Sequence, residues 1–200
     1  MLTGLKEEIM RKLFKIVLLG VLLLGFVSGT ASAYLVDTGP GVRDPWSLGG
    51  MTGQCLAAEF SLVNLSTITS IEGWIICWTG GNLVAAIYSD GGDVPGTKIF
   101  STSFSITKDT PPTWHWHGAI GLDWTLKPGT YWVVFEIPQG SAVVATMPSS
   151  SDQPLGNEAY KLPGNPWIPF NTLDIGVRID GSPVTVKPLS IAPLLLLLLE

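Results

Sequence analysis

Two histidines, His115 and His117, are separated by one residue in the sequence Trp-His-Trp-His that begins at Trp114. Two imidazoles at this spacing lie on the same face of a β-strand and can share a metal ion. A complete site needs a third or fourth ligand, and with no other histidine in the chain this would be a carboxylate or a thiol. We therefore favour the simpler interpretation, in which both histidines lie on a solvated strand face.

Tryptophan is the second residue type that could contribute to a functional site, because the chain contains eight tryptophans. The flat apolar face of an indole can stack on the C–H face of a sugar ring, and its N–H can still donate a hydrogen bond. Four tryptophans lie in or beside expected loops and are our candidates for a ligand-binding surface: Trp46, Trp114, Trp116 and Trp167. The other four lie within expected strands, where core packing is predicted: Trp74, Trp78, Trp124 and Trp132.

Asp90 and Asp93 flank two glycines in a turn and could bring two carboxylates to one Ca²⁺ ion. The same four residues are also ordinary turn chemistry, and their spacing is not that of a complete calcium loop. Calcium is therefore a weak prediction, and we expect no other cofactor.

Cys55 and Cys77 are the only cysteines. A turn at residues 64–67 lies midway between them, so the two thiols would face each other if the flanking strands paired directly. We predict a disulfide, which would stabilise the fold by about 3 kcal/mol. The alternative is a pair of buried free thiols that behave as small hydrophobic side chains.

Catalytic signatures are absent from the sequence. The triplet Asp37-Thr38-Gly39 is that of aspartic proteases, but their chemistry needs a second carboxylate from an equivalent triplet, and the chain has none. No serine-nucleophile elbow, zinc-protease motif, phosphate loop or dinucleotide fingerprint occurs. We predict a protein that is not an enzyme. The alternative is a glycan-active hydrolase, with two carboxylates drawn from Glu59, Glu72, Glu136 and Glu158.

Hydrophobic and polar residues alternate along the middle of the chain, which is the pattern of β-strands. The alternation is clear over residues 56–63, and residues 68–78 are rich in isoleucine, threonine and tryptophan. Further strands are expected at 83–88, 98–106, 114–124, 130–137, 142–147 and 173–179. With 23 glycines and 15 prolines available for turns, we predict an all-β fold, an antiparallel β-sandwich of jelly-roll type over residues 34–183.

The first 33 residues read as a signal peptide. Basic residues precede an apolar run over 16–27, and Ala31-Ser32-Ala33 forms a small-residue cleavage site. Residues 34–200 would then keep seven basic and fourteen acidic residues, a charge that excludes nucleic acid and anionic membrane surfaces as partners. We expect an exported protein, extracellular or on the cell surface, with the periplasm as an alternative.

Residues 184–200 form a separate linker and tail that contains six consecutive leucines, Leu194 to Leu199. The run is too short to cross a bilayer. It could be a final strand, a frayed tail, a damaged gene end, a sorting signal or a segment that docks on a partner. The oligomeric state is not predicted from the sequence.

Several turn-and-strand phrases in residues 34–181 are characteristic, among them Ala86 to Gly96, Leu126 to Val133 and Gly176 to Gly181. In these phrases the chain resembles the exported β-sandwich proteins of the PEP-CTERM sorting type, which occur in bacteria that make extracellular polysaccharide. The resemblance implies association with the cell surface or matrix, and it carries no activity. Val186-Lys187-Pro188 stands where such proteins have Pro-Glu-Pro, and the leucine run replaces a full membrane helix.

The leading hypothesis is thus a non-enzymatic exported protein that associates with extracellular polysaccharide or matrix, with carbohydrate as the expected ligand. A second hypothesis is a structural subunit whose leucine tail adds a strand to a neighbouring chain.

Overall fold

The computed structural model describes residues 34–41, 46–49, 53–148, 153, 155–170 and 174–184. These residues form strands, turns and loops, with no helix among them, so the all-β prediction is confirmed. No helix within the described ranges is long and apolar enough to span a membrane. The predicted signal peptide, residues 1–33, and almost all of the predicted tail lie outside the described residues.

Twelve strands are described, and the chain enters the first of them at Tyr34. Their bounds are β1 (Tyr34–Asp37), β2 (Trp46–Gly49), β3 (Cys55–Leu62), β4 (Ser66–Thr79), β5 (Gly81–Asp90), β6 (Pro95–Ile106), β7 (His115–Leu126), β8 (Gly129–Glu136), β9 (Val144–Met147), β10 (Glu158–Lys161), β11 (Trp167–Pro169) and β12 (Val177–Pro183).

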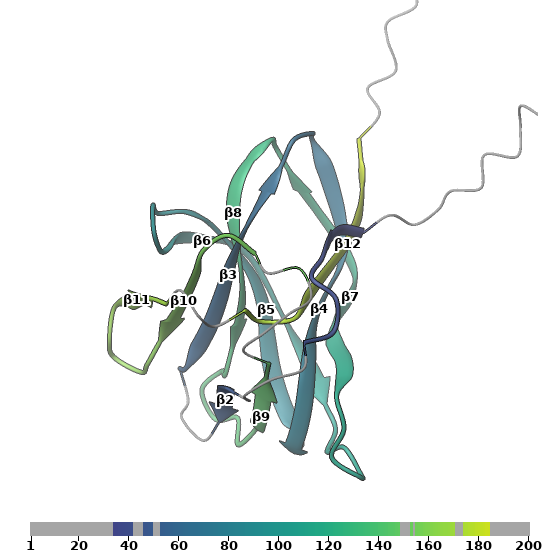
Figure 1. The fold of residues 1–200 in the computed structure, drawn as a ribbon, viewed down its shortest axis with the longest axis vertical. Coiled ribbons are helices and arrows are strands. Elements are labelled where there is room, and N and C mark those ends of the chain that lie inside the picture. The colour runs from purple at the N-terminus through teal and green to yellow at the C-terminus, as the bar shows by residue number, and fades with distance from the viewer. Residues whose placement is uncertain are drawn as a thin grey trace, which may run out of the picture. The chain divides into compact units, whose positions relative to one another are not determined.

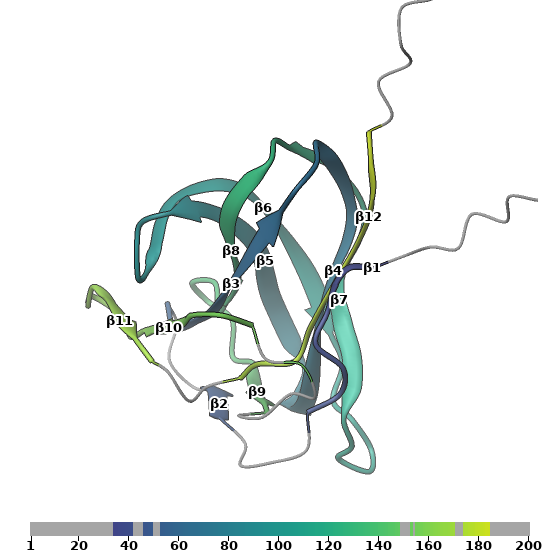
Figure 2. The same ribbon diagram turned by 45° about the horizontal axis from the view of Figure 1, so that its top comes forward.

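The strands form two antiparallel sheets of six strands each, which face each other as a β-sandwich (Figures 1 and 2). The first sheet has the order β1-β12-β4-β9-β2, and β7 pairs with the other edge of β4. The second sheet has the order β11-β10-β3-β8-β5-β6. Where β6 and β7 meet, the ring of Phe100 stacks on Trp124 at 5.3 Å and connects the two sheets.

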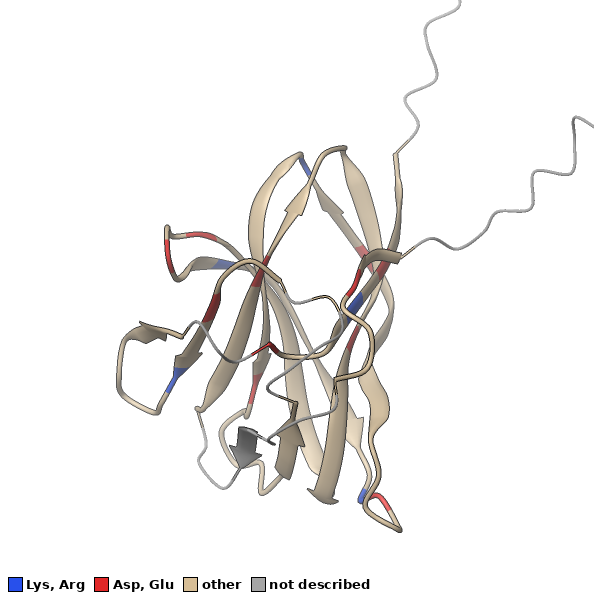
Figure 3. Cartoon of the chain, in the orientation of Figure 1, with Lys and Arg blue, Asp and Glu red and all other residues tan. Residues whose placement is uncertain are grey.

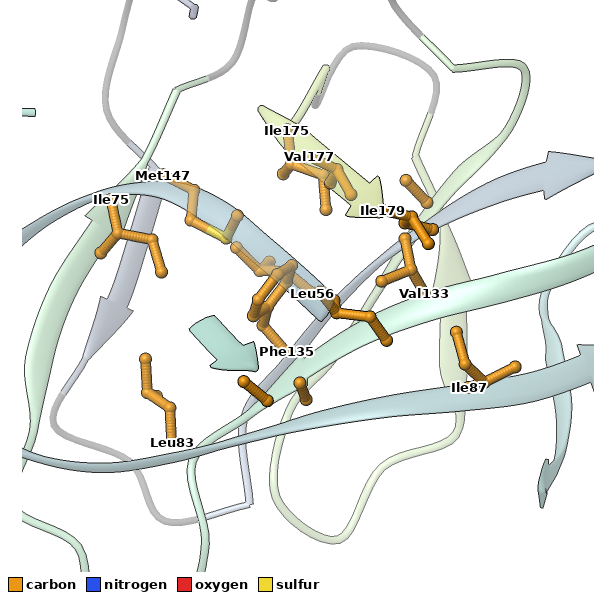
Figure 4. Packing of buried hydrophobic residues seen from close by; sticks show 14 of the residues in the cluster. Leu56, Ile75, Leu83, Ile87, Val133, Phe135, Met147, Ile175, Val177 and Ile179 are labelled. Atoms are coloured by element: carbon orange, nitrogen blue, oxygen red, sulfur yellow. The ribbon is translucent and has the colours of Figure 1, made fainter. Parts of the chain in front are cut away.

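The main core lies between the sheets, because alternate residues of every central strand point inward (Figure 4). Leu56 and Phe135 enter it from the second sheet, and Ile75 and Val177 enter it from the first. All four are at most 1% exposed. Each such side chain contributes about 1.5–3 kcal/mol through burial of apolar surface.

A second, smaller cluster covers the outer face of the second sheet. It contains Trp132 and Val134 of β8 and Ala57 of β3, and Trp167 packs against it. Trp132 is fully buried there, so its predicted burial is confirmed, although it lies outside the space between the sheets. The second sheet therefore buries apolar side chains on both of its faces.

The predicted disulfide between Cys55 and Cys77 is wrong, because both cysteines are free and buried. The turn at residues 64–67 does not join neighbouring strands: β3 belongs to the second sheet and β4 to the first. Cys55 consequently lies in the outer cluster of the second sheet, and Cys77 lies in the main core. Their thiols hydrogen-bond separate carbonyl oxygens, those of Gly53 and Thr79.

Candidate functional site

The outer face of the first sheet gathers tryptophans on two neighbouring strands. In β4 the inward residues Ile75 and Cys77 are fully buried. Trp74 precedes this pair and Trp78 follows it, so both tryptophans point outward. Trp74 lies directly opposite Trp116 of β7, and their ring centroids are 5.0 Å apart. Trp114 immediately precedes β7, two residues before Trp116, and is partly exposed. We call this group of four tryptophans the tryptophan face.

Arg178 of β12 fixes the position of Trp116. Its guanidinium carbon lies 4.0 Å from the centre of the Trp116 ring and 5.0 Å from that of Tyr34. Its Nε donates a hydrogen bond to Oδ1 of Asp37 at 3.1 Å. Cation–π attraction on two sides and an ion pair on the third together restrict this long side chain to one orientation.

A row of charged residues crosses the first sheet beside the tryptophans. Asp37 of β1 lies opposite Arg178 of β12, and Arg178 lies opposite Glu72 of β4. Gly118 of β7 lies opposite Glu72 on the other side of β4. Asp180 lies one step further along β12, where it accepts a hydrogen bond from the Ser70 hydroxyl at 3.0 Å. Figure 3 shows the same pattern, with acidic residues around the basic segment of β12.

The electrostatics of this row centre on Glu72. Burial raises the pKa of its carboxyl group, the neighbouring Asp180 raises it further, and Arg178 opposes both. Arg178 is the one cation of this row among the described residues, and it is already paired with Asp37 and stacked on two rings, so the described row keeps an excess of negative charge.

Of the four tryptophans that the sequence nominated for binding, Trp116 lies against Trp74 on the outer face, and Trp114 adjoins it at the start of β7. Trp167 lies on the other sheet, with its ring edge-on to Tyr88 at 5.9 Å and beneath the Lys161 ammonium at 5.8 Å. The Trp46 side chain is outside the described residues, although its backbone pairs with Met147.

Two tryptophans that sequence reasoning assigned to the core belong to the site instead. Trp78 is 44% exposed and Trp74 is half-buried on the outer face, so the core prediction is wrong for both. The signal that could have found them is their spacing: Trp74, Ile76 and Trp78 alternate with buried Ile75 and Cys77. Trp124, by contrast, is half-buried and packs against the main core.

The two histidines lie on the opposite side of β7 from Trp116, as the alternation predicts, but they are not equally solvated. The side chain of His115 is 55% exposed, while that of His117 is 18% exposed. Oδ1 of the buried Asp109 lies 3.5 Å from Nε2 of His117 and 4.0 Å from Nε2 of His115. Burial lowers the pKa of His117, and Asp109 opposes this shift.

Asp109 is the carboxylate nearest to these histidines, and it has a structural role. Its Oδ2 accepts a hydrogen bond from the backbone N–H of Cys77 at 2.7 Å, and its own N–H donates to the Cys77 carbonyl at 2.9 Å. Across the described ranges, no set of three or more His, Cys, Asp or Glu residues is arranged to hold a metal ion.

The two candidate calcium ligands have different surroundings. Oδ1 of Asp90 accepts a hydrogen bond from the Gly92 N–H at 2.9 Å and a longer one from the Trp132 indole at 3.4 Å. Asp93 instead lines a cavity of about 250 Å³ together with Asn157, Glu158 and Pro169. Calcium binding stays a prediction.

A cleft of about 410 Å³ lies beside the row of charges, at the β1 edge of the first sheet. Asp37 lines it from β1, and Glu59 and Phe60 line it from β3 of the other sheet. The Glu59 carboxylate accepts a hydrogen bond from the Asn157 side chain. The described lining holds two carboxylates and no tryptophan, so the cleft differs in chemistry from the tryptophan face.

Comparison with known proteins finds no family model, no curated protein and no solved structure that matches this chain. Function is therefore inferred from the chemistry of the site.

Proposed function

We propose that this protein binds carbohydrate through the tryptophan face of its first sheet and has no catalytic role. The observation that carries the proposal is the position of Trp74, Trp78 and Trp116 on two adjacent strands of one outer face, with Trp114 immediately before the second strand. The exposed face of an antiparallel sheet ordinarily carries polar side chains. Indoles in that position provide flat apolar surfaces at the spacing of neighbouring strands, which suits the C–H faces of successive sugar rings.

The polar residues beside the indoles support the same function. Sugar hydroxyl groups need hydrogen-bond partners, and the carboxylates of Glu72 and Asp180 offer acceptors next to the rings. Trp116 is held by Arg178 and Trp74 before any ligand arrives. Such preorganisation lowers the entropy cost of binding.

The wider setting is proposed on the basis of sequence. The signal-peptide pattern of residues 1–33 supports export, and the resemblance to PEP-CTERM proteins supports extracellular polysaccharide or matrix as the partner. We also propose the jelly-roll variant of the sandwich. Its support is the repeated crossing of the chain between the sheets, from β3 to β4, from β4 to β5, from β6 to β7 and from β7 to β8.

The test is a titration of tryptophan fluorescence with soluble pentasaccharides and with the extracellular polysaccharide of the producing organism. We expect Trp78→Ala to weaken binding by about tenfold, the scale of a lost anchor residue. Trp167→Ala, on the other sheet, is the matched control and should bind as the unmodified protein does. A flat fluorescence response to every glycan, or an equal loss in both variants, would contradict the proposal.

A second candidate function is glycan hydrolysis in the cleft, which is favoured by the presence of two carboxylates, Asp37 and Glu59, in its lining. Its test is release of reducing ends from the same glycans, with Glu59→Gln as the inactivating variant. The strand-addition hypothesis concerns residues 193–200, which lie outside the described residues.

A further inference from the structure

Three carboxylates and one cation border the tryptophan face on β1, β12 and β4. They are Asp37, Glu72, Asp180 and Arg178. Arg178 is committed to Asp37, from which its Nε is 3.1 Å distant. Glu72 and Asp180 are diagonal neighbours on the adjacent strands β4 and β12, and they have no second cation beside them among the described ion pairs. An anionic ligand would be repelled from this border, and a cationic one would be attracted.

The face already binds one cation of the chain itself. The Arg178 guanidinium lies between the rings of Trp116 and Tyr34, with Asp37 as its carboxylate partner. Two aromatic rings and a carboxylate are thus a combination that accommodates positive charge at this surface. Trp74 and Glu72 are the corresponding ring and carboxylate on β4, one step along the sheet.

Asp180 has acceptor capacity left. Its Oδ2 is bonded to Ser70, while its Oδ1 is buried and has no partner among the described residues. Gly118 stands opposite Glu72 on β7 and has no side chain of its own to place beside the Glu72 carboxylate.

We infer that the tryptophan face selects saccharides that carry a protonated amine, with the ammonium group held beside Glu72 and Asp180 while the sugar rings lie on the indoles. This inference rests on the proposed carbohydrate binding and names its ligand class. Deacetylated amino sugars carry the required charge in mildly acidic solution, where their amines are protonated. Their N-acetylated and plain hydroxyl counterparts share the ring shape and lack the charge, and uronates carry the opposite sign.

The test compares three pentasaccharides with the same linkage: pentaglucosamine, penta-N-acetylglucosamine and cellopentaose. Affinities are measured by calorimetry on the unmodified protein and on the double variant Glu72→Gln with Asp180→Asn. We expect the unmodified protein to prefer pentaglucosamine by about tenfold, because an ammonium–carboxylate hydrogen bond is charge-assisted. In the double variant the preference for pentaglucosamine over the two uncharged pentasaccharides should disappear, because the amide side chains keep an oxygen that accepts hydrogen bonds and lose the charge.

The matched control is Glu136→Gln, which removes a carboxylate from the second sheet, where Glu136 pairs with Lys98. Its preference for pentaglucosamine should be unchanged. Equal binding of the three pentasaccharides overturns the inference and leaves the proposed function standing. A preference that survives in the double variant also overturns it, because the overall negative charge would then be the cause. Failure of all three to bind contradicts carbohydrate binding itself.

Discussion

At the scale of single residues, the negative charge of the Glu72 carboxylate destabilises the folded protein. Its carboxyl is partly buried beside Asp180, and both conditions favour the protonated form. The folded protein therefore holds this proton to a higher pH than the unfolded chain does. Stability falls as pH rises through that window, and the full penalty is present at neutral pH.

We predict that Glu72→Gln stabilises the protein at neutral pH. The melting temperature should rise by about 2–4 °C if about 1 kcal/mol is recovered in a protein of this size. The gain should vanish below the ordinary pKa of glutamate, where the carboxyl is protonated in both states. Calorimetric melting at the two pH values is the measurement. The contrasting variant Glu136→Gln should destabilise, because it removes the ion pair with Lys98 and leaves Tyr88 a neutral acceptor in place of a charged one.

The two cysteines give a second prediction at this scale. Burial raises the pKa of Cys55 to about 12 and also raises that of Cys77, so neither forms the reactive thiolate at neutral pH. In the native protein both thiols should resist a thiol-specific reagent, and both should react once the protein is unfolded. A reductant should leave the melting temperature unchanged. A fall in that temperature on reduction would show a disulfide and contradict the structure.

At the scale of elements, the pairing of β4 with β7 builds the tryptophan face. Their register sets Trp74 opposite Trp116, and it shifts between Ile68 and Ser70. Gly118 permits the close approach of the two strands. A Cβ atom there would lie 2.6 Å from the Cα of Glu72 and would also clash with the carbonyl oxygen of Ile71.

We predict that Gly118→Ala forces β7 away from β4 and destabilises the protein by about 1–3 kcal/mol. Because Trp116 is two residues away, glycan binding should weaken as well. Urea unfolding and the fluorescence titration measure the two effects. Gly156→Ala is the control, since a Cβ there meets nothing within 4 Å and should leave both unchanged. Equal behaviour of the two variants would show that the strands do not approach as closely as described.

At the scale of the whole molecule, the sequence predicted the long central strands, missed the short strands β1, β2 and β11, and did not predict how the strands pair. Alternation around Leu56 and Phe60 predicted β3 correctly, because period-two burial is a local property. The crossing from β3 to β4 between the sheets was missed, since a short turn looks the same whether it joins neighbours or opposite layers. The false disulfide followed from that one error.

The candidate site was predicted only in part for a related reason. Trp78 and Trp132 both lie in apolar strands, yet one is exposed on the first sheet and the other is buried on the outer face of the second. Which outer face is covered depends on packing by distant segments, such as Trp167 on β11. The sequence around a tryptophan does not show whether a distant segment packs over it. The exposed tryptophans could therefore not be distinguished from the buried ones.

The most direct measurement is an NMR spectrum of the protein with ¹⁵N-labelled tryptophan, recorded during titration with pentaglucosamine. Each indole N–H gives one signal, assigned by single Trp→Phe variants. The signals of Trp74, Trp78, Trp114 and Trp116 should shift together with one dissociation constant, while those of Trp132 and Trp167 stay in place. Shifts confined to Trp167, or saturation with no shift on the tryptophan face, would contradict carbohydrate binding at this surface.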